Sequence, residues 1–181
     1  AFYVIENSGY YFQNPLEIFM LSRGGMSWFG GLFLGVAAGV FFLKRSKYKA
    51  YAVLDLLVPF VVLAQSLGRI GCFLNGCCFG KESLYGVYSP LQGAVLIPTQ
   101  IYSSLALLII FVILRFFQER KHRAGQIFYM YLFLYSVKRF IIEFFRADNK
   151  VFSSGLTLFQ LLSLVIFIIS SFMLFKIFTK K

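Results

Sequence analysis

Five apolar stretches, separated by short polar segments, set the pattern of the 181-residue chain. A helix needs about 20 predominantly apolar residues to cross a bilayer, and each stretch approaches or reaches that length. The pattern therefore predicts an all-α integral membrane protein with about five transmembrane helices. The predicted spans are 26–43, 51–67, 98–117, 126–145 and 156–178.

Residues 1–25 precede the first span and are rich in tyrosine. Tyrosines are enriched at the level of the lipid headgroups, and Tyr3, Tyr10 and Tyr11 fall in this segment. We expect 1–25 to form an interfacial arm. We expect 26–181 to form one helical transmembrane domain that carries the lipid-binding site.

The composition agrees with a membrane protein, since 59% of the residues are hydrophobic. The net charge of +11 does not indicate nucleic-acid binding, because the basic residues sit in short clusters between apolar stretches. The clusters at 44–49, 119–123 and 180–181 predict cytoplasmic segments under the positive-inside rule. The arm, segment 68–80 and the loop that begins at Arg146 then face outward.

Segment 68–80, with the sequence GRIGCFLNGCCFG, follows the second span and concentrates unusual residues. Its glycines permit tight turns or close approach to a ligand. Its arginine, Arg69, offers a planar charged fork that suits phosphate. We interpret this segment as a loop that shapes a binding site.

The fourth span carries charges where charges are costly. Tyr131, Tyr135, Arg139 and Glu143 are four residues apart and share one helix face. Placing an arginine or lysine at mid-bilayer costs about 2.5–3.5 kcal/mol on insertion scales, so such residues should be paired or used on a ligand. The alternative is a salt bridge that only orients helices. Lys138 is expected to extend outward to the interface.

The predicted topology brings Arg69, Arg139 and Arg146 together near the outer leaflet. Three guanidinium groups around a partly dehydrated cleft could bind phosphate, and the phosphate available there is a phospholipid headgroup. Glu143 would orient one arginine. A channel or transporter is less favoured, because the charges gather at one membrane face and no polar path leads to the other.

Cys72, Cys77 and Cys78 leave several interpretations open. A disulfide from Cys72 to either neighbour would stiffen the loop. The cysteines could instead fill a tight turn, or one could act as a nucleophile near Arg69. A complete zinc site is weakly supported, because neither a nearby histidine nor a second cysteine pair is present. No cofactor and no metal are expected.

Several motifs resemble elements of the bacterial prolipoprotein diacylglyceryl transferases, and through most of the chain they follow one another in the same order as in that family. Segment 68–80 resembles the family signature G-R-x-G-N-F-x-N-x-E-x-x-G. Residues 139–146 resemble an R-x-x-x-E-F-x-R element. Three further resemblances are 24–31 to a G-G-M-S-F-H-G-G loop, 98–102 to an H-P-S/T-Q-L-Y element that begins one residue earlier, and Asp55 with Pro59 to D-x-x-x-P.

The resemblance implies a reaction at the outer face of the bacterial cytoplasmic (inner) membrane. Such enzymes transfer diacylglyceryl from phosphatidylglycerol to the lipobox cysteine of a preprolipoprotein signal peptide and release glycerol phosphate. It implies catalytic roles for Arg69, Arg139, Glu143 and Tyr135. The implied lipid-binding residues are Arg69, Gly71, Asn75, Gly80, Arg139, Arg146, Gly30 and Gly31.

The chain also departs from the family pattern. Phe29 occupies the position of the loop histidine, which is a candidate general base. Cys72 and Cys77 replace the asparagine and glutamate of the signature, and Ile97 replaces the histidine before the Pro-Thr-Gln element. The alternative function is therefore a non-catalytic membrane subunit that binds anionic phospholipid.

Overall fold

The computed structural model describes residues 35, 37–39, 41–43, 45, 48–147 and 155–179. The chain divides into two compact units, Ala1–Lys49 and Ala50–Lys181. In the first unit the described residues between 35 and 45 are helical, and the Arg45 guanidinium lies 4.6 Å from the centre of the Phe41 ring. The predicted arm 1–25, Phe29, Gly30 and Gly31 lie outside the described residues.

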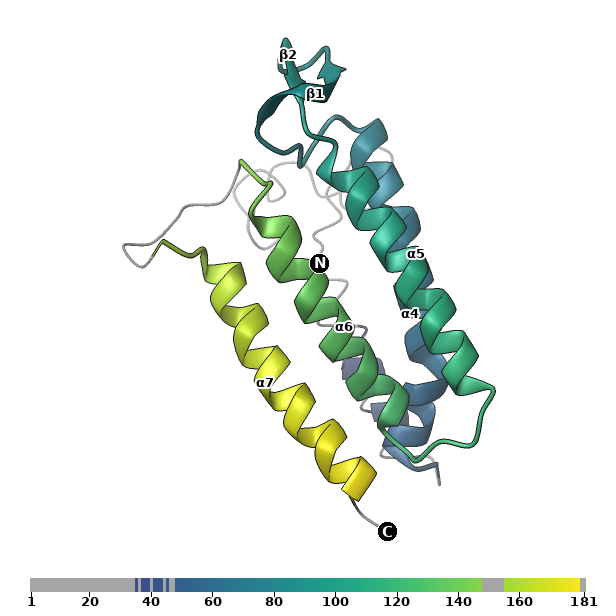
Figure 1. Ribbon diagram of the computed structural model, residues 1–181. Helices are drawn as coiled ribbons and strands as arrows, with labels where there is room; N and C mark the ends of the chain where they lie inside the picture. The colour runs from purple at the N-terminus through teal and green to yellow at the C-terminus, as the bar shows by residue number, and fades with distance from the viewer. Residues whose placement is uncertain are drawn as a thin grey trace, which may run out of the picture. The chain divides into compact units, whose positions relative to one another are not determined.

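Among its described residues, the second unit contains four helices and a short hairpin (Figure 1). Helix α4 packs against α5, α5 against α6, and α6 against α7. The hairpin lies at the end of the helices where α4 ends and α5 begins (Figure 1). The elements are α4 (Ala50–Leu74), β1 (Glu82–Ser89), β2 (Ala94–Leu96), α5 (Thr99–Gln118), α6 (Gln126–Glu143) and α7 (Leu158–Thr179).

The helices confirm the predicted all-α membrane fold. Among the described residues, α4, α5 and α7 are long and apolar enough to cross a membrane. Helix α6 has 18 residues and carries Lys138, Arg139 and Glu143, so its composition alone does not mark it as a span. It nevertheless packs against α4, α5 and α7.

One local prediction was wrong, and one element was not predicted. Segment 68–80 is not wholly a loop, because α4 continues through Gly68 and Gly71 to Leu74. Each glycine costs roughly 1 kcal/mol in a helix, but the packing of α4 against α5 outweighs that cost. The following segment, for which the sequence predicted no element, forms a hairpin: β1 and β2 pair antiparallel, with Tyr88 opposite Val95 and Ser89 opposite Ala94.

The packed core lies between α4, α5 and the start of α6. Its buried members are Val58, Val62, Leu107, Ile110, Leu114 and Ile127. Ser66 and Ser104 bring α4 and α5 close: each hydroxyl donates to the other residue's carbonyl oxygen at 2.9 Å. Small residues of this kind let membrane helices approach closely while their polar groups stay paired.

Asp55 on α4 holds the beginning of α6. Its carboxylate accepts hydrogen bonds from the backbone amides of Gly125 (2.6 Å) and Phe128 (2.8 Å). These amides belong to a helix N-terminus, where the helix dipole favours a negative charge. Pro59 cannot donate to the Asp55 carbonyl one turn earlier, and Gln118 supplies that hydrogen bond at 2.8 Å. The Asp-x-x-x-Pro pattern is therefore a joint between three helices.

The burial pattern of helix α7 is the reverse of that of a helix in a protein surrounded by water. Its fully buried residues are Gln160, Ser163 and Ser170, whereas large apolar residues such as Phe172 and Phe175 are exposed. Polar groups inside and apolar groups outside are what a lipid environment requires of a helix.

Candidate functional site

The charged face of α6 is organised around Arg139. Its guanidinium lies 3.1 Å from the Glu143 carboxylate and stacks 4.6 Å from the centre of the Phe159 ring on α7. Glu143 is buried and also accepts a hydrogen bond from the Thr157 hydroxyl at 2.9 Å. Contacts from two directions therefore fix Arg139 in one orientation. One turn earlier on the same face, the rings of Tyr131 and Tyr135 lie 5.6 Å apart.

Lys138 was expected to extend outward to the membrane interface, but it points inward. It is buried, its ammonium donates to the Ser103 hydroxyl on α5 at 3.1 Å, and it lies 4.5 Å from the centre of the Tyr135 ring. The expectation failed because α5 offers a hydroxyl and α6 offers an aromatic face, and both are good partners for an ammonium group.

The structure brings together basic side chains from α4, from α6 and from the residues just after α6. Arg69, Arg139 and Arg146 all lie close enough to Lys138 to repel its charge, and Arg69 and Arg146 also repel Arg139. We call these four residues the basic cluster. Like charges held together in a low-dielectric setting favour a bound anion that relieves their repulsion. The functional roles of its arginines remain a prediction.

Gly80 joins the signature segment to the end of α6. Its amide donates to the Ile97 carbonyl at 2.8 Å, and the next amide, of Lys81, donates to the Phe145 carbonyl at 2.9 Å. A Cβ atom at Gly80 would stand 2.4 Å from the Phe145 oxygen, so only glycine fits. The resulting bridge between Gly80 and Arg146 places Arg146 beside the signature segment.

The other predicted site residues of segment 68–80 lie nearer the surface. Asn75 is exposed, and its amide donates to the Gly71 carbonyl at 3.0 Å at the end of α4. A Cβ atom at Gly71 would meet nothing within 4 Å. The structure therefore gives no steric reason for this glycine, and a role in lipid binding stays a prediction for both residues.

The three cysteines meet in the turn after α4. Their Sγ atoms all lie within 4.8 Å of one another, and the Cys77 and Cys78 sulfurs are 3.4 Å apart. All three thiols are free, so neither of the disulfides considered above is present. Burial and the neighbouring thiols raise the pKa of the Cys77 thiol to about 11, which argues against an activated nucleophile at this position.

Side chains from the start of α5 hold this turn in place. Gln100 donates to the Cys77 carbonyl at 2.5 Å, and the Thr99 hydroxyl donates to the Cys78 carbonyl at 2.8 Å. Both side chains are almost fully buried. In the sequence, Thr99 and Gln100 stand out only as part of a motif; in the structure, the Pro-Thr-Gln element holds the cysteine turn in place.

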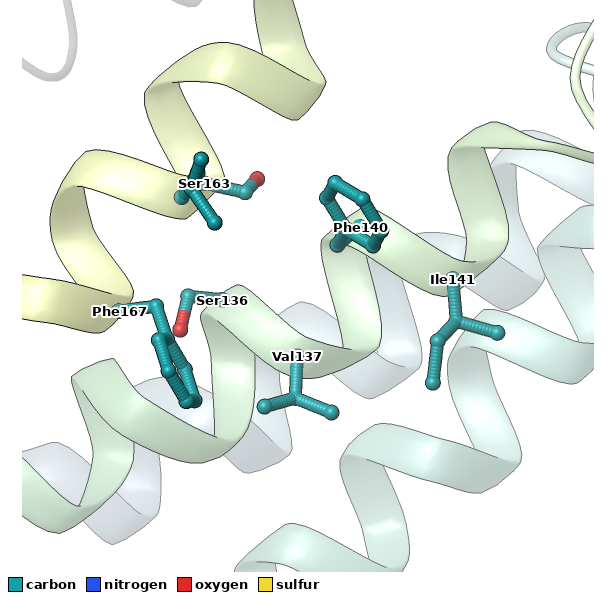
Figure 2. Close-up of a pocket in the computed structure, with 7 residues that line it drawn as sticks. Ser136, Val137, Phe140, Ile141, Ser163 and Phe167 are labelled. Carbon is teal, nitrogen blue, oxygen red and sulfur yellow. The ribbon is translucent and has the colours of Figure 1, made fainter. Parts of the chain in front are cut away.

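An apolar cavity of about 180 Å³ lies between α6 and α7. Its lining residues on α6 stand on either side of Arg139 in the sequence. Figure 2 shows side chains from both helices around it. The hydroxyls of Ser136 and Ser163 donate to carbonyls of their own helices, so they leave the cavity apolar. Sequence reasoning missed it, because lipid-facing and cavity-lining residues look alike. Its lining residues are Ser136, Val137, Phe140, Ile141, Ser163, Leu164 and Phe167.

Comparison with known proteins identifies a family model and several relatives that this chain matches. The family model described as prolipoprotein diacylglyceryl transferase matches residues 1–176. A phosphatidylglycerol–prolipoprotein diacylglyceryl transferase of Clostridium tetani is 34% identical, over 94% of this chain and 71% of that protein. The proteins of that name from Staphylococcus xylosus and Idiomarina loihiensis are 33% and 36% identical. They align over 93% and 88% of this chain, which spans 64% and 63% of their lengths.

Proposed function

The chain belongs to the prolipoprotein diacylglyceryl transferase family, and we propose that it transfers diacylglyceryl from phosphatidylglycerol to the lipobox cysteine of a preprolipoprotein. Glycerol phosphate is the other product. The observation that carries the proposal is the basic cluster, in which a buried carboxylate and an aromatic ring hold Arg139 among other cations. A phosphodiester headgroup is the anion that a lipid brings to such a place.

In this proposal Arg69 and Arg139 bind the phosphate and stabilise the charge that it gains as it leaves. Donors aimed at a developing charge typically contribute a factor of about 10²–10³ to the rate. Glu143 and Thr157 keep Arg139 oriented, and Arg146 adds positive charge beside Gly80. Tyr135 lies between Tyr131 and the Lys138 ammonium, from where its hydroxyl would orient the headgroup.

The apolar cavity supports a lipid substrate. It is lined by Phe140 and Ile141, which directly follow Arg139, and by residues of the neighbouring α7. A lipid whose phosphate lay at Arg139 could place part of an acyl chain between these helices. We therefore assign the cavity to an acyl chain and the basic cluster to the headgroup.

The basic segments support an active site at the outer face of the bacterial cytoplasmic membrane. The loop from Glu119 to Arg123 lies at the opposite end of α5 from the cysteine turn. The positive-inside rule assigns that loop to the cytoplasm. Segment 68–80 and the basic cluster then face the periplasm or the cell exterior, where a preprolipoprotein signal peptide would arrive.

The test is incubation of the purified full-length protein with phosphatidylglycerol vesicles and a lipobox peptide, followed by mass spectrometry. We expect the peptide to gain one diacylglyceryl group through a thioether, and a peptide with serine in place of cysteine to gain none. Phosphatidylcholine vesicles provide the lipid control. Retention of phosphatidylglycerol without any product would favour the alternative, a lipid-binding subunit, for which Phe29 in place of a histidine is the motivating observation.

A further inference from the structure

The cysteine turn has the dimensions of a metal site. A zinc–thiolate bond of about 2.3 Å places the sulfurs of a tetrahedral site about 3.8 Å apart. The three Sγ atoms already lie within 4.8 Å of one another, so small side-chain rotations would bring them to that spacing. Soft thiolate donors select zinc and other thiophilic metals rather than magnesium or calcium.

The backbone holds the sulfurs in this arrangement. Cys72 lies in the last turn of α4, and its carbonyl accepts a hydrogen bond from the Cys77 amide at 3.1 Å. Cys78 has a φ of 66°, which is uncommon for a residue with a side chain. Gln100 and Thr99 clamp the carbonyls of Cys77 and Cys78 from α5. A strained turn held from outside is typical of a functional site.

The site offers three protein ligands and leaves one position open. Among the described residues, the group contains three sulfurs and neither a histidine nor a carboxylate. His122, the single histidine of the sequence, follows α5, whose 20 residues span about 30 Å from the cysteine turn. The three cysteines are also partly exposed. Three protein ligands with an accessible fourth position are the arrangement of catalytic zinc sites, whereas structural sites are closed.

We propose that Cys72, Cys77 and Cys78 bind a zinc ion whose fourth ligand is the cysteine thiol of the peptide substrate. This inference rests on the proposed function. The zinc ion would supply a means of forming the thiolate that thiol transfer needs, which the cations of the basic cluster do not provide. The one histidine of the sequence lies at the far end of α5. A thiol that coordinates zinc is deprotonated.

The step balances without an oxidant or a reductant. The substrate thiol gives its proton to water as its sulfur binds zinc. The sulfur then attacks the glyceryl carbon, a carbon–sulfur bond forms, and the carbon–oxygen bond to phosphate breaks. The phosphate leaves with that electron pair, and zinc keeps its charge throughout. Arg69 and Cys72 are three residues apart on α4, so nucleophile and phosphate would lie on one helix face.

Metal content is the first measurement and does not depend on activity. The full-length protein, purified under reducing conditions without chelator, should contain about one zinc per chain. Cys72→Ser, Cys77→Ser and Cys78→Ser should each lose most of it. Leu84→Ser, on the exposed hairpin, is the matched control and should keep it. A folded, reduced wild-type protein that neither contains nor takes up zinc would overturn the proposal.

Cobalt replacement tests the open position. The cobalt-loaded protein should show sulfur-to-cobalt charge-transfer absorption, and a lipobox peptide should increase it by about a third as a fourth sulfur binds. The serine peptide should leave the band unchanged. An equal response to both peptides would overturn the proposal, because the thiol would then not be a ligand. Dipicolinate should remove the metal from the wild-type protein and zinc should restore it, which keeps the test valid if a serine variant misfolds.

Activity separates this inference from the proposed function. If wild-type protein forms product, each serine variant should be at least 100-fold slower, while Leu84→Ser keeps its rate. Product formation that persists in Cys72→Ser, or in zinc-free protein, would overturn the zinc site and leave the transferase intact. Zinc and thiol binding without product would support the site and count against the transferase.

Discussion

A buried carboxylate lies at each end of the helical unit, and the two carboxylates have different partners. At one end Asp55 is buried, and two backbone amides at the start of α6 satisfy its carboxylate. At the other end Glu143 is equally buried, but its partner Arg139 sits among further cations. The first arrangement is complete without a ligand. We expect the second to become more favourable when an anion binds, because an anion relieves the repulsion between the cations.

On this difference we propose to distinguish a structural charge, Asp55, from a functional one, Glu143. Both carboxylates are costly to bury, and both are paired. Asp55 joins elements of the fold, because the groups that it binds belong to the backbone of another helix. Glu143 instead pairs with a side chain, Arg139, for which we propose contact with a ligand. The partners of a buried charge, rather than its burial, therefore indicate its role.

The largest expected effect is on catalysis at Arg139. Arg139→Ala should lower turnover by about 10²–10³-fold, because a donor to the leaving phosphate is lost. Arg139→Lys should recover only part of the rate, since an ammonium group cannot make the planar two-pronged contact. Product formation by mass spectrometry measures both. Arg115→Ala, which removes a half-exposed arginine paired with Glu119, is the control and should keep full activity.

The largest expected effect on stability is at Asp55. Asp55→Ala leaves two amides at the start of α6 without their acceptor, which should cost about 3 kcal/mol of unfolding free energy. Denaturation in detergent measures it. Glu119→Gln, which changes an exposed carboxylate near the same end, should cost less than about 1 kcal/mol. Equal effects of the two variants would contradict a structural role for Asp55.

A smaller effect on both properties is expected at Gly80. Gly80→Ala brings a methyl group to 2.4 Å from the Phe145 oxygen, so the bridge to Arg146 must shift. We expect about 2 kcal/mol of destabilisation and a loss of turnover that exceeds the fall in folded protein. Gly93→Ala, on the hairpin, would meet nothing within 4 Å but has a φ of 66°, so it shows the cost of backbone strain alone, whereas Gly80→Ala shows the cost of a clash.

The smallest expected effect is at Lys138. Lys138→Met removes a buried ammonium group that the neighbouring arginines repel, and methionine fills most of the volume of the lysine side chain. Unfolding free energy should change by less than about 1 kcal/mol, because relief of repulsion offsets the lost hydrogen bond to Ser103. Affinity for phosphatidylglycerol should fall several-fold, measured by lipid retention in detergent. A strong loss of stability would contradict the placement of Lys138 in the basic cluster.

The sequence predicted the fold well where periodicity and length carry the signal. The predicted spans that fall within the described residues agree with α4–α7 within a few residues, except that α4 extends seven residues beyond its predicted end at Leu67. Glycines suggested a loop there, but helix packing overrides their weak local preference. The hairpin was missed because its Leu84 and Tyr85 are exposed and give no pattern of burial.

The candidate site was predicted in part. The four-residue spacing on α6 correctly paired Arg139 with Glu143, because helix geometry alone determines which residues meet. It could not predict that Lys138 turns inward, since the Ser103 hydroxyl comes from another helix. It also missed the clamp by Thr99 and Gln100, because contacts between segments 20 or more residues apart leave no local signal.

The most direct test compares the two ends at the same amount of folded protein. Turnover per folded molecule should be measured for Arg139→Ala and Asp55→Ala, with phosphatidylglycerol and a lipobox peptide. Our account predicts that Arg139→Ala is folded and nearly inactive, whereas Asp55→Ala is less stable but active per folded molecule. An active Arg139→Ala variant, or an Asp55→Ala variant that is stable and inactive, would contradict it.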